Sequence, residues 1–206
     1  MILKKLIAAE SRDWAIFVGL GNPGREYENT RHNIGFSVIQ QAGKRWGFDV
    51  NRYRFKALCG DGMVNGKRVV LVMPQTYMNN SGLAVASFVK YYRIDLERLV
   101  IIHDDLDLPF GSIRMRKAGG SAGQKGMQSI ISRLSSEDFP RLRVGIGRPP
   151  GRMDPVDYVL KKFKTADEVV LNEIHSACTS ALETFLDEGI EKAMTLYNRS
   201  SQNDAA

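Results

Sequence analysis

Three short apolar runs, each followed by a segment with helical periodicity, most constrain the fold of this 206-residue chain. The runs cover residues 15–18, 69–73 and 99–102. A strand that is apolar throughout is buried on both faces, as in parallel sheets whose connecting helices cover both sides. The alternation therefore predicts an α/β fold with a central, mixed, mostly parallel twisted sheet flanked by helices.

The chain length predicts one domain, which we place at residues 14–197. Residues 1–13 are expected to form a leader extension, because Lys4 and Lys5 interrupt its apolar run and Glu10 and Asp13 follow, which makes a poor targeting signal. The polar residues 198–206 are expected to form a flexible tail.

The remaining elements follow from periodicity and turn residues. A helix is predicted from Ile34 to Trp46, with Gly47 ending it. Asn65-Gly66 predicts a hairpin turn. Further strands are expected at 55–60, 63–64, 112–115 (an edge strand) and 142–146, and further helices at 83–89, 127–134, 157–160, 166–187 and after residue 190. Residues 118–126 are rich in glycine and predict a loop.

Charge and cysteine content narrow the functional classes. Lys and Arg number 29 against 23 Asp and Glu, a net charge of +6, which favours a polyanionic partner such as nucleic acid. Cys59 and Cys178 are far apart and show no CxxC spacing, which favours a reducing compartment, taken as the cytoplasm, over a disulfide framework. No apolar stretch approaches a membrane span in length.

The run from Gly19 to Gly24 matches G-x-G-x-x-G, the dinucleotide-binding fingerprint. In that fingerprint the helix begins within the glycines, whereas here Pro23 and a polar stretch delay it to Ile34. No acidic residue ends a second strand about twenty residues on. The pattern therefore favours a tight strand-to-loop turn, and we predict no cofactor.

Polar residues cluster where the predicted strands end, which is where ligands bind in such sheets. His32 is the natural general base there near neutral pH, whereas His175 is expected to be structural or merely exposed and His103 is assigned no role. Asp104 is expected to accept a hydrogen bond from the His32 ring and so fix its tautomer. For the acidic segment Asp104, Asp105 and Asp107, a solvated turn remains the alternative. A metal cluster there is disfavoured, because no second carboxylate-rich segment or histidine pair completes a ligand set.

Asn22 and Asn79 follow two different strands and carry amides that can position a water or donate to an oxyanion, although Asn is also a common turn residue. Together with a histidine and an acid, they fit attack of a water on an acyl bond. Arg114, Arg116 and Lys117 flank the glycine-rich loop, where they form either a solvated face or a contact for a phosphate backbone.

Three motifs resemble those of the bacterial-type peptidyl-tRNA hydrolases, from about residue 14 to at least residue 162. They are Gly-Leu-Gly-Asn-Pro-Gly-x-x-Tyr-x-x-Thr-Arg-His-Asn-x-Gly, Pro-x-Thr-Tyr-Met-Asn-x-Ser-Gly and His-Asp-Asp-Leu-Asp-Leu-Pro-x-Gly. The resemblance implies a monomeric α/β enzyme that needs no metal. It would hydrolyse the ester between a peptide and the 3′-terminal ribose of tRNA, recycling tRNA in translation.

By matching positions, the resemblance implies His32 as the catalytic base, Asp104 as its partner, and Asn22 and Asn79 as groups that position peptide, water and carbonyl. It also implies a peptide channel lined by Tyr27, Tyr77 and Met78, and contacts of Arg116 and Arg143 with the tRNA acceptor region.

One position departs from the family. Where many members carry Gly-Gly-His-Asn-Gly, this chain has Ala122-Gly123-Gln124-Lys125-Gly126, so Lys125 replaces an Asn that helps hold the substrate. We expect an active enzyme whose Lys125 meets a phosphate or the terminal ribose. The alternative is a silent relative kept for RNA binding, as in plant organelle intron splicing.

Overall fold

The computed structural model describes residues 14–198, and within them the strands form one open sheet. Its order is β2-β3-β4-β1-β5-β7-β6. The strands are β1 (Trp14–Gly19), β2 (Arg52–Arg54), β3 (Ala57–Val64), β4 (Lys67–Pro74), β5 (Leu99–Asp105), β6 (Ile113–Arg116) and β7 (Arg141–Gly145). The central strands β4, β1, β5 and β7 are parallel, and β2, β3 and β6 pair antiparallel at the edges. The predicted mixed α/β sheet is confirmed.

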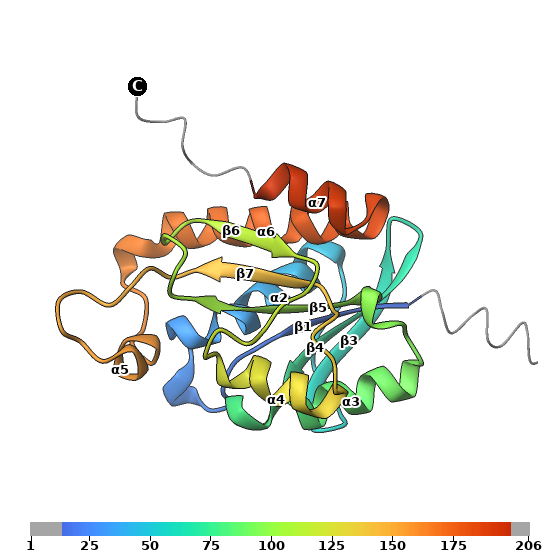
Figure 1. Ribbon diagram of the computed structural model, residues 1–206. Coiled ribbons are helices and arrows are strands. Elements are labelled where there is room, and N and C mark those ends of the chain that lie inside the picture. The colour runs from blue at the N-terminus through green and yellow to red at the C-terminus, as the bar shows by residue number, and fades with distance from the viewer. Residues whose placement is uncertain (1–13, 199–206) are drawn as a thin grey trace, which may run out of the picture.

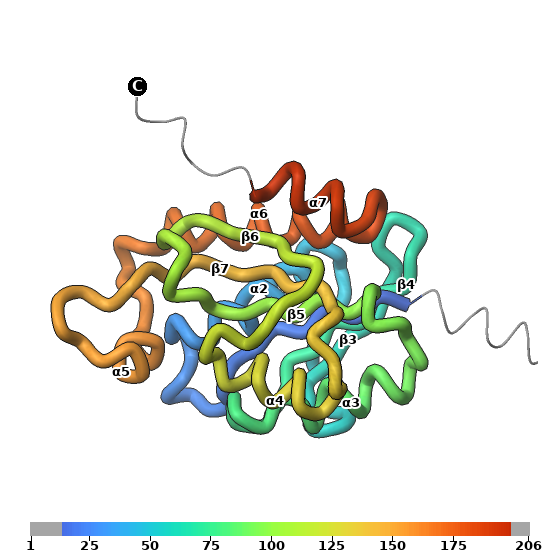
Figure 2. Tube along the Cα trace, in the orientation of Figure 1, coloured from blue at the N-terminus to red at the C-terminus, as the bar shows by residue number. Residues whose placement is uncertain are grey.

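The helices cover both faces of the sheet (Figure 1). The helices α3 (Ser81–Tyr92) and α4 (Lys125–Leu134) pack together on one face, whereas α2 (Ile34–Trp46) and α6 (Glu168–Glu188) pack together on the other. Two shorter helices, α5 (Pro155–Val159) and α7 (Ile190–Tyr197), flank α6 in the sequence. Figure 2 follows the chain from β1 in the middle of the sheet to α6 and α7 along one side.

The apolar runs are buried on both faces, as the sequence predicts. In β1, Phe17 belongs to the core cluster beneath α2 and α6, whereas Ile16 and Val18 belong to the cluster beneath α3 and α4. Because successive side chains of a strand point to opposite faces, one continuous apolar strand serves both cores. Because β4, β1, β5 and β7 run parallel, their carboxyl ends lie at one edge of this sheet, whose two faces are covered by helices.

Several boundaries differ from the sequence predictions. Phe55 was expected within a strand, but Phe55 and Lys56 form the turn between β2 and β3, both with positive φ (49° and 60°). The short strand β2 was not predicted, because three polar and aromatic residues carry no alternation signal. Helix α4 begins at Lys125 rather than residue 127. The predicted edge strand is confirmed as β6, and the other predicted helices are present as α2, α3, α5, α6 and α7.

Close contact between β1 and α2 depends on two glycines. A Cβ at Gly19 would lie 2.1 Å from the carbonyl oxygen of Gly35, and a Cβ at Gly35 would lie 2.5 Å from the Leu20 nitrogen and 2.6 Å from the Ile102 oxygen. These last two atoms form a backbone hydrogen bond of 2.9 Å. The absent side chains let the start of α2 rest directly on the ends of β1 and β5.

The expected leader at residues 1–13 and residues 199–206 of the expected tail lie outside the described residues. Asn198, the first residue of that tail, is part of the folded edge: its side chain accepts from Met115 N–H (2.7 Å) and donates to Met115 C=O (2.9 Å). From residue 14 to residue 198, no helix has the length and apolar character needed to cross a membrane.

Candidate active site

An open pocket of about 480 Å³ lies at the carboxyl edge of the parallel strands. It brings together seven of the residues singled out from the sequence, namely Asn22, His32, Tyr77, Met78, Asn79, Asp104 and Lys125. They come from the segments after β1 and β4, from the end of β5 and from the start of α4. Tyr27 does not line the pocket; its ring packs edge-on against Tyr77, with centroids 6.4 Å apart.

His32 and Asp104 form the central pair of this pocket. His32 lies in a short 3-10 helix (Arg31–Asn33), and its Nδ1 is 2.7 Å from Asp104 Oδ2. The Asp104 side chain is 4% exposed and that of His32 is 15% exposed. An ionised carboxylate only accepts hydrogen bonds, so Nδ1 carries the proton and the lone pair lies on Nε2.

The two residues beside His32 are both anchored. Asn33 donates through Nδ2 to the Asn22 carbonyl (2.8 Å) and accepts at Oδ1 from the Asn22 N–H (2.9 Å). Arg31 donates to the carbonyls of Lys161 and Lys162 (3.1 and 3.0 Å) and stacks on Tyr158. His32 is therefore held between two fixed neighbours. Asn33 is part of the first sequence motif, but no role was expected for it.

The two candidate amides differ in how freely they can act. Asn22 is buried, and its Oδ1 accepts from the Met78 N–H (2.8 Å). Among the described residues its Nδ2 has no partner, so the donor end of this amide is available. Asn79 is exposed at the pocket rim, and both ends of its side chain are without a hydrogen bond in the described part of the chain. Both can donate to an oxygen in the pocket, and Asn79 also carries an amide oxygen that accepts no hydrogen bond within the described residues.

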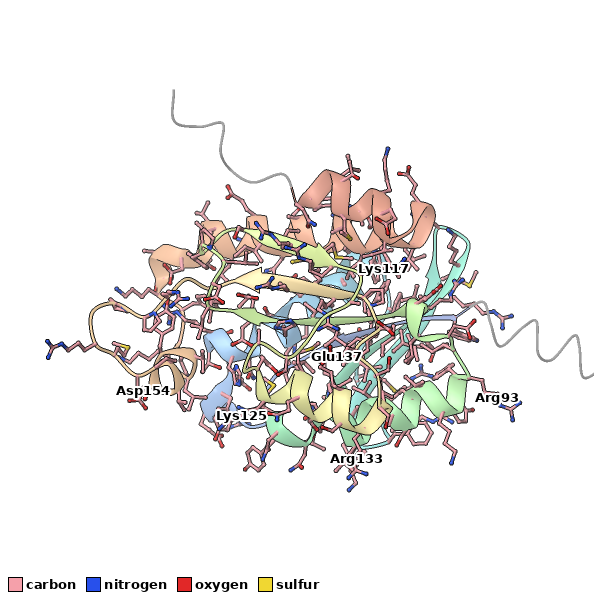
Figure 3. All side chains as sticks on the ribbon, in the orientation of Figure 1. Arg93, Lys117, Lys125, Arg133, Glu137 and Asp154 are labelled. Carbon is pink, nitrogen blue, oxygen red and sulfur yellow. The ribbon has the colours of Figure 1, made fainter. Side chains whose placement is uncertain are left out.

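Gln124 lies in this network, although no role was expected for it from the sequence. Its Nε2 is 3.2 Å from Asp104 Oδ1 and 3.3 Å from Met78 Sδ, and its Oε1 accepts from the Met127 N–H (2.8 Å). Two signals were available: Gln124 belongs to the run that departs from Gly-Gly-His-Asn-Gly, and it lies three residues before the predicted helix, near the positions where side chains cap helices. Lys125 follows as the first residue of α4 and is exposed at the pocket (Figure 3).

The acidic segment is divided among separate partners. Asp104 faces His32, Asp105 forms an ion pair with Arg143, and Asp107 lies 2.5 Å from Arg148. Between residues 14 and 198, no group of three or more His, Cys, Asp or Glu side chains is arranged to hold a metal ion. Each of these three carboxylates therefore has a different partner in the local structure.

Of the other two histidines, His103 is buried and His175 is partly buried. His103 Nδ1 lies 2.7 Å from the Asp104 carbonyl, and burial lowers the pKa of His103. His175 Nε2 lies 2.9 Å from Ser37 Oγ, and burial, helped by Lys44, lowers the pKa of His175. The lowered pKa values keep both rings neutral near pH 7.

A basic face adjoins the pocket on the outer strands. Arg114 pairs with Arg143 and Arg116 with Arg141 across β6 and β7, so all four side chains leave the sheet on one face. Arg141 is buried and donates to the Gly120 carbonyl (2.9 Å), which anchors the glycine-rich loop. In the described part of the chain, Arg114 and Arg116 have no acidic partner.

Lys117 lies farther from the pocket than the other basic candidates. It follows Arg116, which pairs with the first residue of β7, so Lys117 is at the amino edge of the parallel strands. Its Nζ is 3.8 Å from Glu191. Figure 3 shows Lys117 at the end of β6 and Lys125 at the start of α4, well separated in this view.

Comparison with known proteins identifies the family and the fold. The family model described as "Peptidyl-tRNA hydrolase" matches residues 16–205. The chain belongs to the peptidyl-tRNA hydrolase family. It is 50% identical over 184 residues to a peptidyl-tRNA hydrolase of Carboxydothermus hydrogenoformans, covering 89% of this chain and 98% of that protein.

Other peptidyl-tRNA hydrolases are similar at a comparable level. A chloroplastic member from Arabidopsis thaliana is 45% identical over 186 residues, which are 90% of this chain and 64% of that protein. The crystal structure of peptidyl-tRNA hydrolase from Acinetobacter baumannii superposes with a TM-score of 0.85 at 34% identity, covering 91% of this chain and 95% of that chain. The resemblance found in the three sequence motifs is confirmed.

Proposed function

We propose that this chain hydrolyses peptidyl-tRNA, with His32 as the general base for a water that attacks the ester carbonyl. Family membership supports the reaction. The observation that carries the mechanism is the 2.7 Å contact between His32 Nδ1 and Asp104 Oδ2, which leaves the basic Nε2 available in the pocket. A base must be unprotonated and within reach of the proton that it removes.

In the proposed reaction, the water oxygen bonds to the ester carbon while one water proton moves to His32 Nε2. Asp104 stabilises the resulting imidazolium and keeps the ring in the productive tautomer. The tetrahedral intermediate then collapses, the bond to the ribose oxygen breaks, and the imidazolium returns its proton to that oxygen. The products are a peptide carboxylic acid and free tRNA, and no metal or cofactor is required for any step.

The oxyanion of the intermediate needs donors aimed at it. We assign this role to Asn22 Nδ2 and to Asn79. The opposite end of the Asn22 amide is held by the Met78 N–H, so its donor end is oriented in advance. Asn79 is free to accept from the attacking water or from the peptide. Met78 and Tyr77 would contact the peptide, and Tyr27 would support Tyr77 by packing against its ring.

The tRNA acceptor end is proposed to bind across the basic face. Arg114 and Arg116 offer guanidinium groups without an acidic partner in the described residues, Arg143 contributes beside Asp105, and Lys125 meets a phosphate or the terminal ribose at the pocket. Lys117 is expected to contribute least, because it lies at the far edge and near Glu191. We further propose that the protein acts as a monomer in the cytoplasm, where its free thiols Cys59 and Cys178 stay reduced.

One assay tests this proposal. The protein is incubated with N-acetylated aminoacyl-tRNA, and free tRNA is separated from the acylated form. The parent should release tRNA, and both His32→Ala and Asp104→Asn should lower kcat/KM by about 100- to 10,000-fold. Release by His32→Ala at the parent rate would overturn the base assignment. A catalytically silent RNA-binding protein would instead bind RNA in a salt-sensitive manner without any release.

A further inference from the structure

Gln124 contacts the Asp104 oxygen that His32 does not use. Its Nε2 donates to Asp104 Oδ1 (3.2 Å), while His32 Nδ1 donates to Oδ2 (2.7 Å). The orientation of the Gln124 amide follows from its other end: Oε1 accepts from the Met127 N–H (2.8 Å), and a backbone N–H can only donate. The amide NH₂ must therefore face the carboxylate.

Both oxygens of Asp104 are thus engaged by side chains from different parts of the chain. His32 precedes α2, and Gln124 precedes α4. Asp104 cannot rotate about its side-chain bonds without losing one of these contacts. Because the carboxylate is almost fully buried, a lost donor would not be readily replaced by water.

Gln124 is itself rigidly placed. It caps α4, and its N–H donates to the Ser121 carbonyl (2.9 Å). The next turn packs closely: a Cβ at Gly126 would lie 2.6 Å from Met78 Sδ and 3.0 Å from Gln124 Oε1. Arg141 anchors the preceding loop at Gly120. The position of the Gln124 side chain beside Asp104 is therefore set by its own hydrogen bonds and by the close packing at the start of α4.

We propose that Gln124 is a positioning residue that holds Asp104, and through it His32, in the geometry of the reacting state. The inference rests on the proposed function of the same pocket. A glutamine suits this task because its amide donates at every pH and has no charge of its own. Because the Gln124 amide does not titrate, its hydrogen bond to Asp104 does not change with pH.

The charged and titratable groups around the pair come from three segments. His32 lies before α2; His103, Asp105 and Asp107 come from β5 and its end; Lys125 comes from α4. Asp105 and Asp107 are paired with Arg143 and Arg148, and His103 turns its Nδ1 to the Asp104 carbonyl. Apart from His32, the side chain that donates to the Asp104 carboxylate is that of Gln124, which is neutral.

Two substitutions separate positioning from helix capping. Gln124→Ser retains a good N-cap side chain but is too short to reach Asp104. Gln124→Met retains the length but neither caps nor donates. Gln128→Ser, on the exposed side of α4, is the matched control. For each, kcat and KM for N-acetylated aminoacyl-tRNA are measured across pH, together with the His32 tautomer from its ring-nitrogen NMR shifts.

If Gln124 positions Asp104, both variants lower kcat by about 10- to 100-fold with little change in KM, because a misplaced catalytic pair affects the reacting state. Without this donor Asp104 can turn away from His32, and the imidazolium loses the carboxylate that stabilises it. The acidic limb of kcat/KM therefore moves to lower pH in both variants, and the His32 ring shows mixed tautomers. Gln128→Ser behaves as the parent.

A capping role alone predicts that Gln124→Ser resembles the parent and only Gln124→Met is impaired, without movement of the pH limb; that result would overturn the inference. If the parent released no tRNA, the proposed function would fail, and the His32 tautomer would still report on Gln124. A single unchanged tautomer in both variants would then overturn the inference by itself.

Discussion

The side chain of Asn33 holds the main chain of Asn22 at both its N–H and its C=O, with N–O distances of 2.9 and 2.8 Å. This joins the loop after β1 to the start of α2, on either side of the segment that carries His32. Both residues are buried, so neither hydrogen bond is readily replaced by water. The candidate oxyanion donor and the candidate base are therefore fixed relative to each other by one amide.

We expect Asn33→Asp to damage this link, because the carboxylate keeps the acceptor but loses the donor to the Asn22 carbonyl. The change should lower the free energy of unfolding by about 1–3 kcal/mol and reduce kcat more than it raises KM. Thermal melts and steady-state kinetics on N-acetylated aminoacyl-tRNA check this. Parent values in both measurements would show that the link is not needed.

Gly35→Ala is expected to be strongly destabilising because its Cβ would meet a backbone hydrogen bond between β1 and β5 at about 2.5 Å. Overpacking of this kind costs about 1–3 kcal/mol or more. Gly66→Ala is the control, since it adds a Cβ in open space and bears only the cost of a positive φ (74°). Chemical denaturation should rank Gly35→Ala well below Gly66→Ala; equal stabilities would contradict the steric argument.

Because of His175, the free energy of unfolding should fall as the pH drops through about 6.5, the pKa of an unperturbed histidine. Burial lowers the pKa of His175, so the unfolded chain takes up a proton there before the folded chain does. Ser37 Oγ donates to the Ile34 carbonyl and so accepts from His175 Nε2. Nδ1 is then buried with no partner among residues 14–198, so a proton at Nδ1 would be unsatisfied.

His175→Gln keeps a donor for Ser37 and removes the titration. One proton contributes at most about 1.4 kcal/mol per pH unit. The parent should therefore lose more stability than His175→Gln between pH 7.5 and 5.5, as measured by thermal melts at both values. The same loss in both proteins would exclude His175 as a source of the pH dependence.

The basic face is expected to set the salt dependence of tRNA binding. Substituting Arg114 and Arg116 together by Gln should weaken binding of uncharged tRNA and lower the slope of log Kd against log salt by about 1 for each lost phosphate contact. Arg93→Gln, at the end of α3 far from Lys125 in Figure 3, is the control and should keep the parent slope. A slope unchanged in the double variant would remove these residues from the interface.

The sequence by itself determined the α/β class, because residues 15–18, 69–73 and 99–102 can be buried on both faces only in a covered sheet. It also indicated His32, Asp104, Asn22 and Asn79, because polar groups that follow parallel strands meet at one edge. Local chemistry was sufficient for these predictions. It was insufficient for β2, whose pairing with β3 depends on neighbouring residues rather than on its own pattern.

Only the tertiary structure decided how those groups are supported. Asn33 and Gln124 act through hydrogen bonds to residues 11 and 20 positions away, and nothing in a local pattern reports such partners. The tertiary structure also distinguishes the basic residues from one another. Arg143 forms an ion pair with Asp105, and Lys117 lies at the amino edge of the parallel strands, opposite the pocket. The physical reason is that side-chain direction and burial depend on which segments pack together, and long-range packing sets both.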